Sequence, residues 1–245
     1  MNYNWNWEVF FQQAPGGSDT YLDWLWIGLQ WTVALSLSGW VIALVLGSIL
    51  GVFRTVPNRL LSTVAAIYVE VFRNIPLLVQ LFIWYFVLPE LLPKSLGDGF
   101  KQMNPLAQQF IAAMVCLGLF TAARVTEQVR AGIGSLPRGQ KNAALAMGLT
   151  LPQAYRYVLM PMAFRIIVPP LTSEFLNIFK NSAVATTIGL IELSRQAQQL
   201  VDYTAQPYEA FIAVTLLYLA INVTVMLVMR VVESRARVPG YIGSK

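Results

Sequence analysis

The chain has 245 residues, of which 56% are hydrophobic and only 12% are charged. A soluble domain carries about 25% charged residues, so this composition, with its long apolar runs, excludes an ordinary soluble globular protein and predicts an integral membrane protein. The formal net charge of +5 does not indicate a nucleic-acid-binding protein, because the basic residues flank the apolar stretches and do not line one soluble face.

Five membrane-spanning helices are expected, because a span requires roughly 20 mostly apolar residues. In chain order the predicted spans are residues 25–53, 60–92, 105–131, 158–182 and 208–231. Residues 1–24 are expected outside the membrane or at its surface, and residues 233–245 form a tail. The predicted fold class is therefore an all-α membrane protein with one membrane domain, residues 25–232.

The first two predicted spans contain features that affect helix packing. Gly47 and Gly51 form a small-xxx-small pair in the first span, which either allows another helix to approach closely or consists of glycines tolerated in lipid. Pro76 is expected to kink the second span. In the same span Glu70 and Arg73 are three residues apart, so they can pair on one helix face.

The third span has a start signal and a second possible ion pair. Asn104 is predicted as its N-cap, since Pro105 follows at a position where proline is favoured. Arg124 and Glu127 are again three residues apart and can pair on one face. Such pairs either hold helices together or belong to a functional site within the membrane.

The fourth predicted span is rich in proline. It contains Pro161, Pro169 and Pro170, and a further apolar piece, residues 183–193, follows it. Proline removes a backbone donor and disturbs a helix. We therefore expect a broken helix in this region, followed by a shorter helix that is partly inserted in the membrane.

Basic residues alternate between the loops and predict the orientation of the chain. The segment before the first span has acidic residues and no lysine or arginine, whereas the loops after the first, third and fifth spans are basic. Because cytoplasmic loops carry the excess of lysine and arginine, we expect the N-terminus outside and the C-terminus inside. The loop of residues 138–157 is then cytoplasmic.

This cytoplasmic loop is expected to fold into two short helices. Residues 140–147 favour a thin, alanine-rich helix, and Gly148 suits the position after a helix end, where a positive φ is needed. Thr150 is a predicted N-cap, and Gln153 completes a capping box with it. Such a segment either docks in a groove of a partner or simply connects two spans.

The spacing in this loop resembles the EAA loop of ABC-importer permeases. Asn142-Ala143-Ala144, three residues, Gly148, nine residues and then Val158-x-Met160-Pro161 match the pattern Glu-Ala-Ala, Gly, Ile-x-Leu-Pro. Asn142 stands where the family has Glu; it keeps hydrogen bonding but lacks the charge. Further segments, residues 72–80, 127–140 and 179–193, resemble the polar amino-acid subfamily, and among its members glutamate/aspartate importer permeases are most similar.

The resemblance implies a type I ABC importer permease fold and a set of partners in a bacterial inner membrane. Such a permease pairs with a second, related permease, here expected as a heterodimer, and with two ATPase subunits and a periplasmic solute-binding protein. We name residues 138–157 the coupling segment, because in the family this loop docks into the ATPase. Its implied contact residues are Asn142, Ala143, Ala144 and Gly148. No cofactor is expected in this chain, since ATP and Mg²⁺ would be held by the ATPase.

An anionic amino acid crossing a bilayer requires basic groups or helix termini that face a cavity. Intramembrane ionisable residues and the expected helix break after residue 180 supply the candidates. The predicted residues of the substrate pathway are Arg73, Glu127, Glu174, Lys180, Asn181, Ser182 and Thr186. No catalytic or metal-binding residue is predicted.

Three other readings compete with this one. A stand-alone secondary transporter, not powered by an ATPase, would usually show internal repeats and more spans. A membrane enzyme is hard to assemble, because the chain has no histidine and its single cysteine, Cys116, lies in an apolar stretch typical of a core residue. A structural scaffold would leave the ordered coupling segment unexplained.

Overall fold

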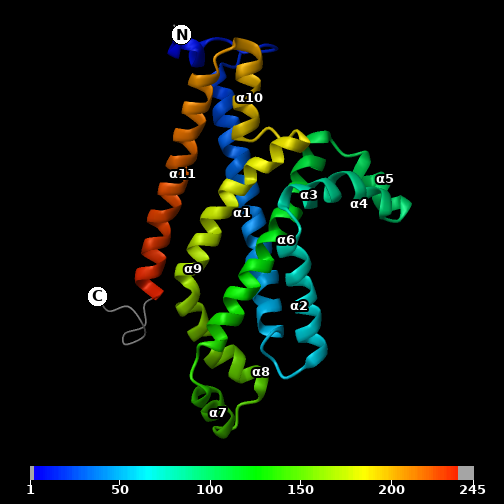
Figure 1. The fold of residues 1–245 in the computed structure, drawn as a ribbon, viewed down its shortest axis with the longest axis vertical. Helices are drawn as coiled ribbons and strands as arrows, with labels where there is room; N and C mark the ends of the chain where they lie inside the picture. The colour runs from blue at the N-terminus through cyan, green and yellow to red at the C-terminus, as the bar shows by residue number, and fades with distance from the viewer. Residues whose placement is uncertain (1–2, 237–245) are drawn as a thin grey trace. The chain divides into compact units, whose positions relative to one another are not determined.

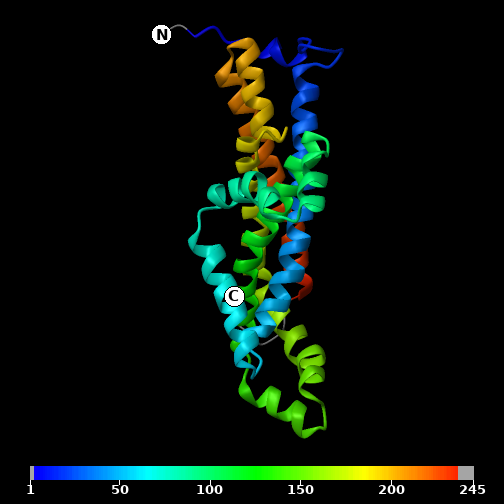
Figure 2. The same ribbon diagram turned by 90° about the vertical axis from the view of Figure 1, so that its right-hand side faces the viewer.

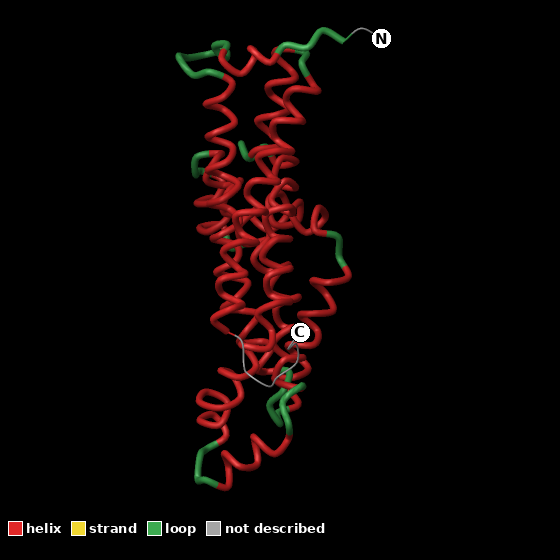
Figure 3. Tube along the Cα trace, turned by 90° about the vertical axis from the view of Figure 1, so that its left-hand side faces the viewer, coloured by secondary structure: helices red, strands yellow, loops and turns green. Residues whose placement is uncertain are grey.

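The computed structural model describes residues 3–236, apart from the side chain of Arg138, and Figure 3 shows that they are almost entirely helical. Within this part of the chain the β structure is limited to an isolated bridge between Gln13 and Thr20. Four helices there are long and apolar enough to span a membrane, or up to five if one broken pair counts as a span. The predicted all-α membrane class is confirmed.

Long helices alternate with short and irregular ones along the chain. In order, the elements are the 3-10 helix η1 (Trp7–Phe11), α1 (Tyr21–Phe53), α2 (Arg59–Asn74), α3 (Leu77–Phe82), the π-helix η2 (Ile83–Val87), α4 (Leu88–Leu91), α5 (Lys94–Lys101), α6 (Pro105–Gly134), α7 (Arg138–Ala146), α8 (Leu151–Ala154), the π-helix η3 (Tyr155–Leu159), α9 (Met160–Asn181), the 3-10 helix η4 (Ser182–Ile188), α10 (Leu193–Thr204) and α11 (Pro207–Ala236).

The chain divides into two compact units. The first comprises the residues up to Trp40, Pro76–Gly118 and Asn177–Thr224. In this unit the N-terminal part of α1, up to Trp40, lies against α10 (Figure 1), and a Cβ atom on Gly28 would lie only 2.8 Å from Cγ of Gln196. A side chain at position 28 would therefore force these two helices apart.

The second unit comprises Val41–Ile75, Leu119–Leu176 and the chain from Val225 onward. Here α1 packs closely on α6: a Cβ atom on Gly47 would lie 2.6 Å from Cβ of Val125, and one on Gly51 would lie 2.5 Å from Cβ of Val129. The small-xxx-small pair in this helix is thus a packing device, which decides between the two readings left open by the sequence. Both valines are fully buried.

The predicted second span is interrupted more sharply than a kink. Helix α2 ends at Asn74, Ile75 is extended, and Pro76 is the N-cap of α3, which begins at Leu77. Proline disfavours the helical conformation in the residue before it, which explains why the helix stops there. The break separates the two units along the chain, since Ile75 closes a stretch of the second and Pro76 opens one of the first.

The prediction that prolines break the fourth span was wrong. Helix α9 continues through Pro169 and Pro170. The irregular turns lie at its two ends: η3 precedes Pro161, and η4 follows Asn181. A π-turn widens the backbone just where the ring of Pro161 meets the preceding turn, so the helix can absorb this proline without ending.

The region after the fourth span also differs from expectation. The predicted apolar helix of residues 183–193 is a short 3-10 helix that stops at Ile188, because Gly189 adopts a left-handed φ of 91°. Helix α10, residues 193–204, was not predicted. Its buried residues, Leu193, Gln196, Ala197 and Leu200, follow helical spacing, but the buried Gln196 makes that stripe look polar in the sequence.

Candidate functional site

As predicted, the coupling segment folds into a helix, a glycine turn and a second helix. It belongs to the second unit. In Figure 2 α7 runs away from α6 and the chain turns back through α8. The backbone N–H of Leu149 donates to the carbonyl of Ala144 at 3.2 Å, and that of Gly148 donates to Leu145 at 3.0 Å. These bonds satisfy the last carbonyls of α7 and require the positive φ of 87° at Gly148.

The second helix of the segment starts with the predicted capping arrangement. The carboxamide oxygen of Gln153 accepts hydrogen bonds from the backbone N–H of Thr150 at 2.8 Å and from its hydroxyl at 2.9 Å. Free N–H groups at a helix start cost energy unless they are paired. Backbone groups at the C-terminus of α7 and at the N-terminus of α8 are therefore both hydrogen-bonded, and the segment has a defined shape.

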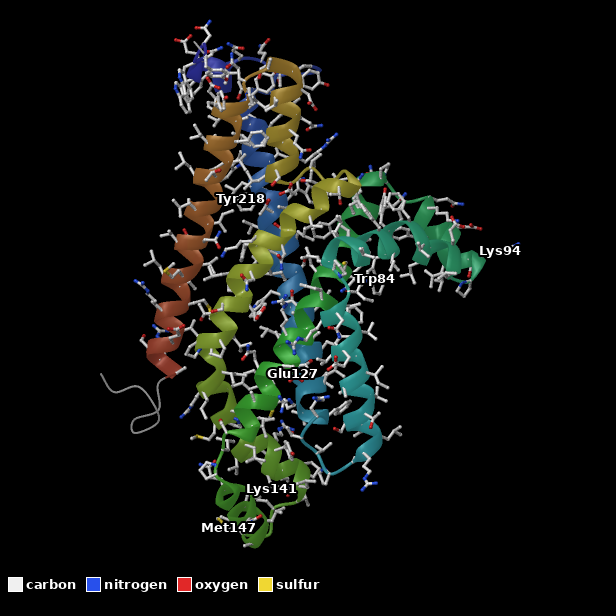
Figure 4. All side chains as sticks on the ribbon, viewed as in Figure 1. Trp84, Lys94, Glu127, Lys141, Met147 and Tyr218 are labelled. Carbon is white, nitrogen blue, oxygen red and sulfur yellow. The ribbon has the colours of Figure 1, made fainter. Side chains whose placement is uncertain are left out.

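The implied contact residues lie mainly on the free surface of the segment. Asn142, Ala143 and Gly148 are exposed, whereas Ala144 is buried with only 4% of its surface accessible. Met147, at the tip of the turn in Figure 4, is 84% exposed. A bare apolar residue at the tip and small residues along α7 make a surface that suits insertion into a partner.

Three of the predicted pathway residues, Arg73, Glu127 and Glu174, lie in the second unit. Glu127 of α6 pairs with Arg54 at the end of α1 at 3.4 Å and with Arg130 at 2.9 Å. The predicted pairing of Glu127 with Arg124 was wrong: Arg124 instead pairs with Glu174 of α9 at 4.0 Å. Sequence spacing along α6 could not show that α9 supplies an acid.

The predicted pair of Glu70 and Arg73 was also wrong. In the described structure Glu70 forms no ion pair with Arg73; its carboxylate accepts a hydrogen bond from the side chain of Asn74 at 3.0 Å. Arg73 is exposed and lies within electrostatic range of Glu174. Two arginines from α2 and α6 therefore act on one glutamate of α9, which leaves this charge cluster with a net positive charge.

The other predicted pathway residues, Lys180, Asn181, Ser182 and Thr186, lie in the first unit where α9 passes into η4. Lys180 is exposed and Asn181 is half-buried. Ser182 is buried, and its hydroxyl donates to the carbonyl of Phe179 at 2.7 Å. The hydroxyl of Thr186 donates to the carboxylate of Glu192. The sequence analysis did not select Glu192 as a pathway residue, and its complete burial is visible only in the structure.

Comparisons with known proteins agree with this architecture. The family "Binding-protein-dependent transport system inner membrane component" matches residues 43–238. The glutamate/aspartate import permease protein GltJ of Escherichia coli (strain K12) is 60% identical over 246 residues, which covers 100% of each chain. The arginine transport system permease protein ArtQ of Bacillus subtilis (strain 168) is 35% identical over 210 residues, 86% of this chain and 91% of the relative.

A solved structure supports the fold as well. The crystal structure of an amino acid ABC transporter with histidines contains a chain that superposes with a TM-score of 0.74 at 31% sequence identity. The match covers 88% of the present chain and 95% of that one. The coupling segment and both units described above lie largely within the region matched by the family.

Proposed function

Because the chain belongs to the family of binding-protein-dependent transport system inner membrane components, we propose that it is one of two permeases in an ATP-driven importer of glutamate and aspartate. The chain is a multi-pass membrane transport subunit and not an enzyme; ATP-binding subunits and a solute-binding protein are the partners that this family implies. We further propose its substrate class, its pairing with a second permease and its orientation in the membrane.

The substrate class rests on one observation, the 60% identity with a glutamate/aspartate permease over the full length of both chains. The arginine permease shares only 35%. A permease that passes an anionic amino acid must stabilise a carboxylate away from bulk water, which requires cationic groups. A pathway that accepts arginine would need the opposite charge balance.

The charge cluster of Arg73, Arg124 and Glu174 supports this substrate class. Both arginines are exposed, and the structure places Glu174 in electrostatic range of both. A substrate carboxylate would balance the remaining positive charge, and a planar guanidinium can bind it through two parallel hydrogen bonds. We therefore assign the side-chain carboxylate of the substrate to Arg124 and Arg73, with Glu174 available to the α-amino group.

Glu127, Lys180, Asn181, Ser182 and Thr186 remain proposed pathway residues of lower rank. Glu127 is occupied by Arg54 and Arg130. Ser182 is buried and bonded to its own helix. Lys180 is exposed at the end of α9, so among these five residues it is the one that can offer a positive charge to an anionic substrate.

In the proposed mechanism the coupling segment transmits motion and performs no chemistry. The N-terminus lies outside and the C-terminus inside, as the loop charges predict, so α7 and α8 face the cytoplasm. ATP closes the two ATPase subunits, and Asn142, Ala143, Ala144 and Gly148 carry their movement to the spans. A second, homologous permease completes the pathway as a heterodimer. Such a machine is a two-state switch biased by ATP and by loaded binding protein.

The test is uptake into vesicles that contain the permease pair and the ATPase, with loaded binding protein outside. Wild type is expected to take up glutamate and aspartate only when ATP is inside. Arg124→Gln and Arg73→Gln should each raise KM for both acids at least tenfold, while Arg59→Gln, a matched loss of charge at the exposed start of α2, should not. Uptake without ATPase and ATP would establish the alternative, a stand-alone secondary transporter.

A further inference from the structure

Glu192 is a buried carboxylate with an unusual set of partners. Its accessible surface is 0%, and none of the ion pairs in the described chain includes it. Hydrogen bonds reach it instead from the hydroxyl of Tyr218 at 2.7 Å, from the hydroxyl of Thr186 and from the backbone N–H of Arg195 at 2.9 Å. Burying an anion is costly unless such donors compensate it.

These donors come from different elements of the first unit. Thr186 belongs to η4, Arg195 to the first turn of α10 and Tyr218 to α11, where it is labelled in Figure 4. The neighbouring Leu193 N–H donates to the hydroxyl of Thr32 in α1 at 3.2 Å. One carboxylate therefore joins η4 to α10 and α11, beside a bond that ties α10 to α1.

The junction fixes the irregular turn that follows α9. A 3-10 helix has strained hydrogen bonds and is rarely long, so η4 gains little stability from its own backbone. Gly189 ends it, and the bond from Thr186 to Glu192 closes the chain over this glycine. Lys180 and Asn181 lie immediately before η4, so their position depends on how η4 is held.

We infer that Glu192 is a positioning residue for transport: it holds η4, and through η4 the end of α9, in the arrangement that passes the substrate. Thr186 serves as its tether: its hydroxyl proton is donated to Glu192, so this hydroxyl is not available to donate to a substrate carboxylate. This inference rests on the proposed import function, but it concerns whichever amino acid the wild-type complex transports.

The test compares variants in the assembled importer in vesicles. Thr186→Val and Tyr218→Phe each remove one donor to Glu192, and Glu192→Gln removes the charge that both donors bind. Each variant should lower Vmax by about tenfold or more, the effect of losing one hydrogen bond to a charged group. Thr186→Ser keeps the hydroxyl and should restore uptake. Thr187→Val is the matched control, since the hydroxyl of the exposed Thr187 donates to Val184 within η4, and it should transport normally.

Two further measurements separate positioning from a simple loss of folding. The double variant Thr186→Val/Tyr218→Phe should be no worse than twofold below the poorer single variant, because both act on one carboxylate. Amide exchange of residues 182–188 should rise in Thr186→Val and not in Thr187→Val. If Glu192→Gln fails to assemble, Thr186→Val and Thr186→Ser, with the Thr187→Val control, still test the inference.

Opposite results would overturn the inference. If Thr186→Val alone raises KM while Tyr218→Phe and Glu192→Gln transport normally, Thr186 contacts the substrate directly. Multiplicative losses in the double variant would show independent roles. Failure of the proposed function would give a different result, because the wild-type complex would then take up another amino acid, or none. The variants would be measured on the amino acid that the wild-type complex does transport.

Discussion

The hydroxyl of Tyr155 donates a hydrogen bond to the backbone carbonyl of Thr55 at 2.8 Å, and this bond fastens the coupling segment to the loop after α1. Tyr155 begins η3, directly after the second helix of the segment, and only 6% of its surface is accessible. Both residues belong to the second unit. Because α8 continues through η3 into α9, a movement of α8 would reach both the loop after α1 and α9.

Tyr155→Phe should loosen this connection. The variant leaves a half-buried carbonyl without its partner, which costs about 1 kcal/mol, and the melting temperature of the purified complex should fall by about 2–4 °C. ATP hydrolysis stimulated by loaded binding protein should fall more than basal hydrolysis. Tyr157→Phe is the control, because Tyr157 is exposed. Equal behaviour of the two variants would contradict the role of the bond.

Gly148→Ala should weaken coupling through backbone conformation alone. No atom lies within 4 Å of a Cβ placed there, but the φ of +87° is unfavourable for any other L-residue, by about 1–2 kcal/mol. The ratio of stimulated to basal ATP hydrolysis reports the effect. Gly139→Ala is matched, because it lies in α7 with equally open space and no positive φ. That variant should keep full coupling, and a comparable loss in both would point to a surface effect.

Gly47→Ala should separate α1 from α6. The added methyl carbon would lie 2.6 Å from Cβ of Val125 and 2.9 Å from the carbonyl oxygen of Ala122, which is backbone and cannot move aside easily. Overpacking of this kind costs about 1–3 kcal/mol, so the purified chain should melt several degrees lower in detergent. Gly134→Ala, in α6 with nothing within 4 Å, should not lower the melting temperature, since alanine favours a helix more than glycine does. An unshifted Gly47→Ala would contradict the close helix contact.

Asn142→Glu should keep or improve coupling. The side chain is exposed on α7, and Glu favours a helix more than Asn by a few tenths of a kcal/mol. It also restores the charge that the family pattern has at this position. Asn142→Ala supplies helix propensity without charge and serves as the comparison. Stimulated ATP hydrolysis should be at least at the wild-type level in Asn142→Glu; its abolition would show that the partner surface of this importer requires a neutral residue.

Local patterns predicted the ends of elements well where one residue decides them. Asn104 accepts from the N–H of Leu106 at 2.8 Å, just before α6 begins at Pro105, and Gly148 and Thr150 close the turn of the coupling segment. The prolines of α9 were expected to break the helix, but α9 continues through Pro169 and Pro170. A helix can continue through proline when the carbonyls left without an N–H partner are satisfied in another way. Helix α10 was missed for a related reason: its buried face includes a polar residue, Gln196.

The candidate site was predicted less completely than the fold. Residue spacing along α6 suggested Arg124 with Glu127, but the acid that Arg124 meets is Glu174, from α9. Likewise Thr186 was selected for the helix break near it, whereas its partner Glu192 was not selected at all. Pairs three residues apart on one helix are visible in a sequence, but pairs between helices depend on how the helices are packed.

The sequence by itself determined that this chain is a helical membrane protein with a coupling segment of defined shape, because hydropathy, caps and glycine turns are properties of a few neighbouring residues. Only the tertiary structure decided which charges pair with one another and which side chains donate hydrogen bonds to the buried Glu192. Those choices involve residues such as Thr186 and Tyr218, which lie far apart along the chain and meet at Glu192. Ion pairs and buried hydrogen bonds act over a few ångströms of space, and for residues on different helices the sequence separation carries no information about that distance.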